Sequence, residues 1–282
     1  NSGDVQSLLP APGDCQGASS RGQPSHLSGR SCGKSSSRGH VNSVIVTIHQ
    51  PEHLPWLGFF DKVRQSDVLV LLDHVQFRKN YYQNRNRILS NRGPMWLTVP
   101  VLTKGKPAQP INEVKVDNRS NPRWREKCWA SMCQHYEKAD CWRDHEAFFY
   151  DLYDQNWDRL ADLNESIIQY ILTSLSLDVR TVRSSEMKVE GHKGDLLLSI
   201  CREAGADVYL SGVSGKSYLD PNAFLDFGIK VHFQEFHHPI YKQVYEPFAS
   251  CMSAIDLLFN CGPACSDVLK GVGVETMDHI FE

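Results

Sequence analysis

The sequence predicts an α/β protein with a mostly parallel, open sheet and a helical insertion. Apolar runs rich in β-branched residues, at 44–48 and 67–72, are typical of buried strands, and the segment between them at 59–63 suits a short helix. Strand, helix and strand within about 30 residues form a βαβ unit, which implies a parallel pair of strands. The same alternation continues further along the chain, at 181–183, 195–201, 207–210 and 228–233.

The first strand ends abruptly in polar and turn residues, and Pro55 follows where a helix begins. Proline is tolerated in the first turn of a helix because its missing N–H has no partner there. In an open α/β sheet, ligands bind in the crevice beyond the carboxyl ends of the strands. We therefore expect four residues of this turn to lie at a binding site: His49, Gln50, His53 and Trp56.

The second strand also ends in polar residues, beginning with Asp73, and a basic, amide-rich loop follows at 78–88. Guanidinium, amide and phenol groups together suit phosphate, carboxylate or sugar hydroxyls. A solvated loop without a ligand is the alternative interpretation. The candidate binding residues of this region are Gln76, Lys79, Asn84, Arg85 and Asn86.

Two further strands are predicted at 96–101 and 111–116, and a helical region follows at about 120–178. Apolar residues recur there at spacings of three and four, which is typical of amphipathic helices. His135 and His145 have no partner at helical spacing that would form a metal-binding face. This region is the predicted helical insertion.

A second turn after a strand lies at 211–220, with the sequence SGVSGKSYLD. Its glycines permit close approach of the backbone, so that N–H groups can cradle a phosphate. It is not a Walker A sequence, because the GxxxxGK[ST] spacing is absent, and an ordinary glycine turn is the alternative. The candidate binding residues here are Ser211, Gly212, Gly215, Lys216 and Tyr218.

Near the end of the chain, His237 and His238 follow the last strand, and a helix is predicted at 253–260. Adjacent residues of an extended segment face opposite ways, so these histidines do not bind one metal ion together. His237 is a candidate substrate contact, and the sequence predicts no metal site.

The composition limits the classes of protein to which this chain can belong. The 282 residues are 41% hydrophobic and carry a net charge of −3, which suits a sizeable core and gives no general case for nucleic-acid binding. No apolar run approaches the ~20 residues of a membrane span. The nine cysteines form no strong zinc or disulfide pattern, so we expect reduced thiols and a cytoplasmic location.

The predicted domain covers residues 44–270, between a leader and a short tail at 271–282. Residues 1–43 are rich in Ser, Gly and Arg and hold too few apolar residues to form a core, so we expect a disordered leader. A transit peptide is the alternative, since acidic residues are few there.

Several separated motifs, in this order, resemble the WbqC-like protein family: IHQPEHLPWLGFFDKV, LLDHVQFRKNYYQNRNRI, WLTVPV, VYLSGVSGKSYLD and HHPIYKQ followed by SAIDLLFNCGP. The resemblance covers about residues 44–263. The chain departs from the family pattern at His53, where an aromatic residue is usual, and at Ser214, where a second glycine is common. The resemblance implies a transferase of O-antigen or other surface-polysaccharide biosynthesis that moves an acyl or aminoacyl group onto an amino sugar or sugar nucleotide.

The strand, histidine turn and helix also resemble Rossmann-like nucleotidyltransferases of the pantothenate synthetase type, in which a HxGH turn holds a triphosphate. His49 and His53 would correspond to that pair, although the glycine is absent and the spacing is one residue longer. This resemblance implies an alternative function, an ATP-dependent adenylyl- or nucleotidyltransferase that uses Mg²⁺. A non-catalytic binding module in a polysaccharide-assembly complex is a further alternative.

The expected roles follow from side-chain chemistry. His49 is the candidate general base, because the ordinary pKa of histidine near 6.5 suits that work, although His53, His237 and His238 are not excluded from the role. Asp73 would orient a base or bind a donor amine. The amides of Gln76, Asn84 and Asn86 would recognise the substrate, and three cations would hold its phosphate or carboxylate: Lys79, Arg85 and Lys216.

Overall fold

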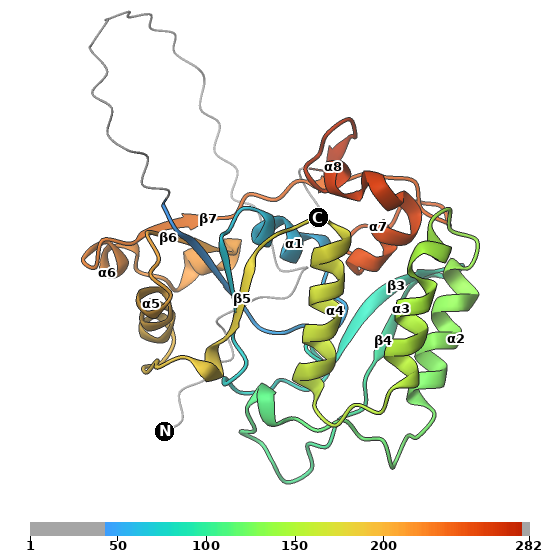
Figure 1. Cartoon of the computed structure of the whole chain (residues 1–282), viewed down its shortest axis with the longest axis horizontal. Coiled ribbons are helices and arrows are strands. Elements are labelled where there is room, and N and C mark those ends of the chain that lie inside the picture. The colour runs from blue at the N-terminus through green and yellow to red at the C-terminus, as the bar shows by residue number, and fades with distance from the viewer. Residues whose placement is uncertain (1–42, 278–282) are drawn as a thin grey trace, which may run out of the picture.

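The computed structural model describes residues 43–277, and its centre is a sheet of five strands that are all parallel. This confirms the predicted α/β fold. The strands lie in the order β5-β2-β1-β6-β7 (Figure 1). Their bounds are β1 Ile45–His49, β2 Val68–Leu71, β5 Arg180–Arg183, β6 Val208–Ser211 and β7 Lys230–Phe233.

Strand β1 lies in the middle of the sheet, and its five residues include the β-branched run that predicts it. It pairs with β2 on one side, where Val46 lies opposite Val68, and with β6 on the other, where Thr47 lies opposite Leu210. The chain leaves β1 toward β2 and later returns to the other side at β6. The carboxyl ends of β1 and β6 therefore form the switch point of the sheet, where open α/β sheets bind ligands.

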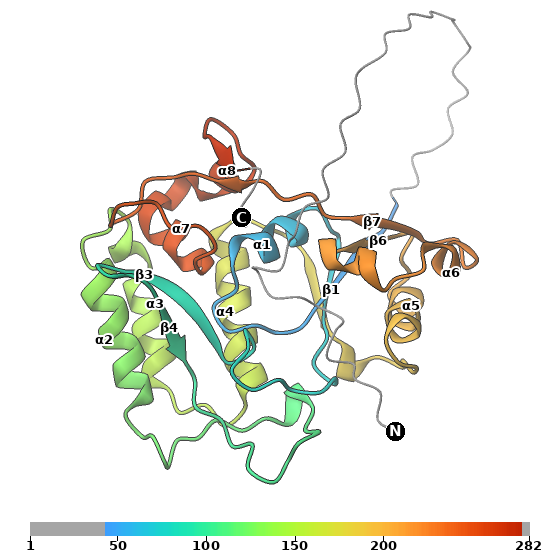
Figure 2. The same cartoon turned by 180° about the vertical axis from the view of Figure 1, so that it is seen from behind.

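The helices gather in two groups around the sheet. Figures 1 and 2 show α2 and α3 on one side of the molecule and α5 and α6 on the other, with α7 and α8 above the first group. Buried apolar side chains of the sheet and the helices form one continuous core. The bounds are α1 Leu57–Arg64, α2 Trp124–Tyr136, α3 Trp142–Asp154, α4 Leu160–Ser174, α5 Gly194–Glu203, α6 Pro221–Leu225, α7 Ala254–Cys261 and α8 Cys265–Leu269.

The segment predicted as a basic loop forms half of an antiparallel hairpin. Strand β3, Arg85–Ser90, pairs with β4, Gly93–Thr98, outside the parallel sheet. Gly93 closes the turn with a φ of +96°, a conformation that favours glycine. The strand predicted at 96–101 is therefore displaced toward the N-terminus, and the loop prediction at 78–88 is wrong from Arg85 onward.

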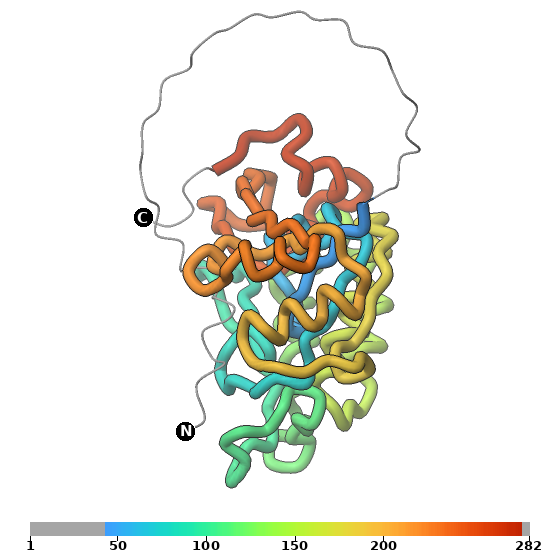
Figure 3. Tube along the Cα trace, turned by 90° about the vertical axis from the view of Figure 1, so that its left-hand side faces the viewer, coloured from blue at the N-terminus to red at the C-terminus, as the bar shows by residue number. Residues whose placement is uncertain are grey.

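The strand predicted at 111–116 is a short 3₁₀ helix, Ile111–Glu113, that follows Pro110. Hydrogen bonds from Glu113 N to Pro110 O and from Val114 N to Ile111 O close this turn. Val116 still forms an isolated bridge to Val101. The loops between β4 and α2 make up the lower end of the molecule (Figure 3).

The predicted leader at 1–43 lies almost entirely outside the described residues. Of the predicted tail, strand β9, Thr276–Met277, pairs with β8, His238–Pro239. Among residues 43–277, no helix combines the length and the apolar character that crossing a membrane requires.

Candidate functional site

The turn after β1 is held by hydrogen bonds to the segment that leads into the hairpin. His53 N donates to Tyr82 O at 2.9 Å, and Asn86 Nδ2 donates to Leu54 O at 2.8 Å. Leu54 has a φ of +50°, which a branched side chain rarely adopts, so its surroundings must hold it there. These bonds hold the 49–56 turn against the 76–87 segment.

His49 lies at the end of β1, with its side chain 14% exposed. Its Nδ1 is 3.0 Å from Gln50 O and 4.0 Å from Glu52 Oε1, and its ring meets the edge of Phe59. Burial, together with the positive charge of Lys62, lowers the pKa of His49 to about 3. The ordinary pKa that favours His49 as a general base is therefore lost, and the imidazole is neutral at physiological pH.

Two charged residues that the sequence analysis missed accompany this histidine. Glu52 is 5% exposed, and its Oε2 has no hydrogen-bond partner among residues 43–277. Burial raises the pKa of Glu52 to about 8, although the charge of Lys62 opposes the shift. A carboxyl group with a pKa near the operating pH is suited to general acid–base catalysis.

Lys62 is 2% exposed within the apolar face of α1, and its Nζ donates to Ile48 O at 3.1 Å. Burial lowers the pKa of Lys62 to about 7, and the charge of Glu52 opposes the shift. The sequence signal was a lysine inside an otherwise apolar helix face, between Phe60 and Val63. A lysine in such a place is rarely buried without a function for its charge.

Asp73, a predicted catalytic residue, forms hydrogen bonds with the segment that follows strand β5. Its Oδ1 accepts from Ser184 Oγ at 3.1 Å and from Ser185 N at 2.9 Å, and its Oδ2 accepts from Ser185 Oγ at 2.7 Å. These bonds join the end of β2 to the residues that follow β5. The carboxylate has the contacts of an anchor rather than those of a group that awaits a substrate.

We expect Asp73→Ala to lower the free energy of unfolding by about 2–3 kcal/mol, because two serine hydroxyls and one N–H lose their acceptor. Urea denaturation measures this change. A loss of substrate conversion with an unchanged free energy of unfolding would contradict the anchoring role and favour the catalytic one.

Most of the side-chain amides expected to contact a substrate instead form hydrogen bonds within the protein. Asn84 Nδ2 donates to Val99 O, Gln76 Nε2 to Pro107 O, and Gln83 Nε2 to Gln50 Oε1. Asn86 Oδ1 accepts from the N–H of Arg87. These side chains shape the site, and their amides are engaged before any substrate arrives.

The histidines other than His49 lie in different environments. His53 is fully buried, with Nε2 3.3 Å from the hydroxyl of Tyr153. His238 is buried and accepts from Cys251 N, whereas His237 is exposed. Trp56 packs against Phe236, and its ring fills the space that a side chain at Gly58 would need.

The glycine turn after β6 is tightly packed. A Cβ added at Gly215 would meet Ser211 Oγ at 2.2 Å, so this position requires glycine. Lys216 Nζ lies 5.8 Å from the ring of Phe233, and burial raises the pKa of Tyr218. Gly212 is extended and has open space around its Cα, so a ligand can approach its backbone. The pairing of β1 with β6 ends at Thr47 and Leu210, so His49 and Gly212 each follow the last paired residue of their strands by two positions.

The outer face of the hairpin carries two arginines and a tryptophan. Arg87 lies directly opposite Trp96, and Arg85 lies two residues earlier on the same face. The guanidinium of Arg85 is 4.2 Å from the Trp96 ring, and Tyr82 lies 5.7 Å from the same ring. Lys79 is exposed on the loop that precedes this cluster.

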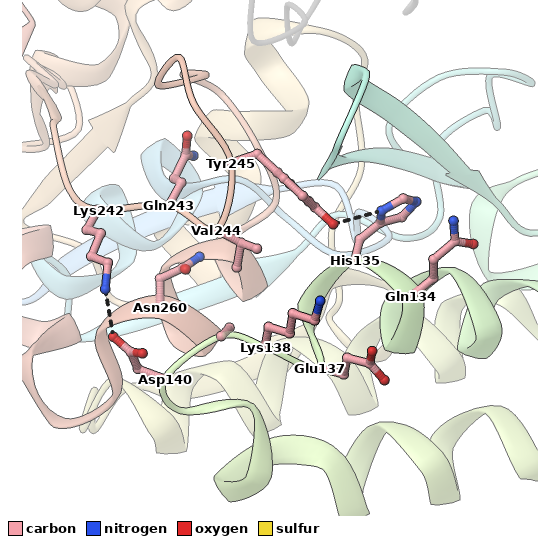
Figure 4. A pocket seen from close by; sticks show the side chains of 11 residues that line it. Gln134, His135, Glu137, Lys138, Asp140, Lys242, Gln243, Val244, Tyr245 and Asn260 are labelled. Atoms are coloured by element: carbon pink, nitrogen blue, oxygen red, sulfur yellow. Dashed lines mark hydrogen bonds and ion pairs between the residues drawn. The ribbon is translucent and has the colours of Figure 1, made fainter.

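Two surface cavities lie apart from these residues. One of about 340 Å³ opens between the end of α2 and residues 242–245, where Lys242 reaches Asp140 and the Tyr245 hydroxyl points at His135 (Figure 4). The other, of about 850 Å³, lies beside the β4–α2 loops. Neither is lined by His49, Glu52 or Lys62. Among residues 43–277, no three or more His, Cys, Asp or Glu residues are arranged to hold a metal ion.

Comparison with known proteins places this turn and hairpin within a described family. The model of the WbqC-like protein family matches residues 50–268, which include the β1–α1 turn, the hairpin and the glycine turn. The chain belongs to the WbqC-like protein family. The match confirms the resemblance drawn from the sequence motifs.

The chain is also similar to an uncharacterized protein of Mycobacterium tuberculosis. It is 30% identical over 227 residues, which cover 80% of this chain and 97% of the relative. No solved structure matches the chain.

Proposed function

We propose that this WbqC-like protein is a cytoplasmic transferase of surface-polysaccharide biosynthesis that moves an acyl or aminoacyl group onto an amino sugar or sugar nucleotide. The observation that carries the proposal is the pair of His49 and Glu52 at the switch point of the sheet. Glu52 Oε2 is buried and has no hydrogen-bond partner within residues 43–277, and Oε1 of the same carboxyl group lies 4.0 Å from His49 Nδ1. An unpaired buried carboxyl oxygen is costly, and a function explains why it is kept.

In this mechanism Glu52 is the general base, in place of His49. As the acceptor amine attacks the acyl carbonyl, the C–N bond forms, and Glu52 takes the proton that the nitrogen loses. The bond from the carbonyl carbon to the donor then breaks, and Glu52 returns the proton to the leaving group. A carboxyl pKa of about 8 permits both protonation states near neutral pH.

His49 has a positioning role in the same mechanism. Since its Nδ1 is 3.0 Å from the carbonyl of Gln50, the ring proton is assigned to Nδ1. Nε2 then keeps its lone pair and accepts a hydrogen bond from the acceptor amine or from a neighbouring sugar hydroxyl. The lowered pKa of His49 keeps the ring in this neutral form.

A second candidate is the ATP-dependent adenylyl- or nucleotidyltransferase. The strand order favours it, because nucleotides bind at the switch point of sheets in which the order reverses at the central strand. In that case, Mg²⁺ would be needed, and pyrophosphate would be released.

The experiment that separates these functions uses the full chain with three sets of ligands: a UDP-linked amino sugar, acyl-coenzyme A, and ATP with and without Mg²⁺. We expect the UDP-linked amino sugar to raise the melting temperature, since a ligand at about 100 times its Kd adds roughly 2.7 kcal/mol. With acyl donor present, mass spectrometry should detect an amide product. Pyrophosphate release from ATP would favour the second candidate, and binding without any conversion would favour the non-catalytic module.

A further inference from the structure

The hairpin holds two positive charges that nothing in the described chain neutralises. Arg85 and Arg87 lie on one face of β3, and neither makes an ion pair with a carboxylate of residues 43–277. Arg64 and Arg183 differ in this respect, since Arg64 lies 2.7 Å from Asp61 and Arg183 contacts Asp162 and Glu165. Two adjacent, unpaired guanidinium groups repel each other unless an anion lies between them.

Both arginines also have a buried donor without an acceptor. The Nε atoms of Arg85 and Arg87 are shielded from solvent and form no hydrogen bond within residues 43–277. Buried polar groups are nearly always paired, and leaving one unpaired costs about 1–3 kcal/mol. These two donors lie on the same face of β3, two residues apart.

The two guanidinium groups are held in place before any ligand binds. Arg85 lies over the ring of Trp96 at 4.2 Å, and an Arg87 Nη donates to the carbonyl of Cys251 at 3.3 Å. Trp96 is 41% exposed despite its size, so its position on this face is open to a ligand. Groups that are fixed in advance lose little freedom on binding.

Tyr82 connects the hairpin face that carries Arg85, Arg87 and Trp96 to the turn that carries Glu52. The Tyr82 ring lies 5.7 Å from Trp96, and its backbone carbonyl binds the N–H of His53 in the β1–α1 turn. Burial raises the pKa of the Tyr82 phenol. The positive charges of Arg87 and Arg85 lower this pKa, and the negative charge of Glu52 raises it. The phenol therefore lies within electrostatic reach of both the cations and Glu52.

We propose that Arg85 and Arg87 form a clamp for the diphosphate of the substrate, beside Trp96, with the reacting group extending toward Glu52. This inference rests on the proposed function for the identity of the reacting group. The charge matches, because two unpaired guanidinium groups balance the two negative charges of a diphosphate diester. Residues two apart on a strand are about 7 Å apart, which lets each guanidinium bind its own phosphate in a planar, bidentate manner.

The test is isothermal titration calorimetry of the full chain with UDP, inorganic pyrophosphate, ATP and malonate. Arg85→Gln and Arg87→Gln should each weaken UDP binding about tenfold or more, and the double variant further. The matched control is Arg92→Gln, which removes the same charge from the exposed turn of the same hairpin and should change the Kd less than about twofold. Arg85→Lys keeps the charge without the planar fork and should still weaken binding.

The outcomes separate the clamp from the proposed function. The clamp is overturned if the double variant binds UDP as tightly as the unchanged protein does. It is also overturned if the unchanged protein binds no diphosphate. Malonate binding as tight as that of pyrophosphate overturns the diphosphate assignment. If diphosphates bind through the arginines but no transfer occurs, the proposed function fails and the clamp stands. If a variant unfolds, which its melting curve reveals, Arg85→Lys decides.

Discussion

Glu52→Gln should lower the rate of group transfer about 100-fold or more and at the same time raise the stability of the protein at pH 8. The rate falls because an amide cannot accept the proton that the acceptor amine releases, and general acid–base groups typically contribute 10²–10⁴-fold. The stability rises because the amide has no charge to bury. A residue kept at a cost in stability is a common property of active sites.

The stability effect has a defined pH dependence. The pKa of Glu52 is raised from 4.5 to about 8 in the folded protein, so the folded state binds a proton more tightly than the unfolded state does. The stabilisation from this proton is fully present below pH 4.5 and is lost as the pH rises through 8. The variant should therefore melt like the unchanged protein near pH 4.5 and be more stable by about 2–4 kcal/mol near pH 8.

Thermal melts at several pH values and an assay of amide formation measure the two effects. The control is Glu203→Gln, the same change at an exposed position at the end of α5. It should alter neither the rate nor the pH dependence of melting. A Glu52→Gln protein that transfers at the normal rate would exclude Glu52 as the base, whatever its stability.

Asp256→Ala should reduce the free energy of unfolding by about 3–5 kcal/mol, the largest stability loss expected for a single change here. Asp256 is fully buried in α7 and accepts hydrogen bonds from Tyr136, Tyr241 and Gln243 at 2.7–2.8 Å. Alanine would leave the hydroxyls of Tyr136 and Tyr241 without this acceptor, and Gln243 Nε2 would keep only its bond to Ala249 O. Because Tyr136 lies in α2, the loss also weakens the contact between two helices that are distant in sequence.

Urea denaturation measures this loss, and Asp151→Ala is a matched control because its side chain is exposed on α3. Asp256→Asn should be milder, since one oxygen of the side chain remains as an acceptor. A loss below about 1 kcal/mol for Asp256→Ala would mean that water replaces the carboxylate among the donors.

The sequence allowed the sheet to be predicted more fully than the site. Strands β1 and β2 were found because runs of Val, Ile and Leu favour buried strands regardless of context. Strand β3 was missed because its first inward position is Asn86, whose amide is buried by a bond to Leu54 that no local pattern reveals. The outward side chains of Arg85 and Arg87 are also polar, so the whole segment was predicted to be a loop.

The roles within the site depended on contacts between distant residues. The place of His49 at a strand end could be predicted from sequence, but its pKa depends first on burial and then on the charge of Lys62 in α1. Asp73 could not be recognised as an anchor, because its partners Ser184 and Ser185 follow more than a hundred residues later. Glu52 went unnoticed because a carboxylate in a polar turn is normally exposed, and only the packed structure removes it from water.

The pairing of Val68 in β2 with Arg180 in β5 bears on the order in which the chain folds during synthesis. When β1 and β2 have left the ribosome, the outer edge of β2 has no neighbour until the hairpin and three long helices have also been made. Contacts between residues so far apart form slowly, because a long loop must close first. During that interval an apolar strand has an open edge, the kind of surface that pairs with other chains. We therefore expect fragments that end before Arg180 to aggregate or to need a chaperone.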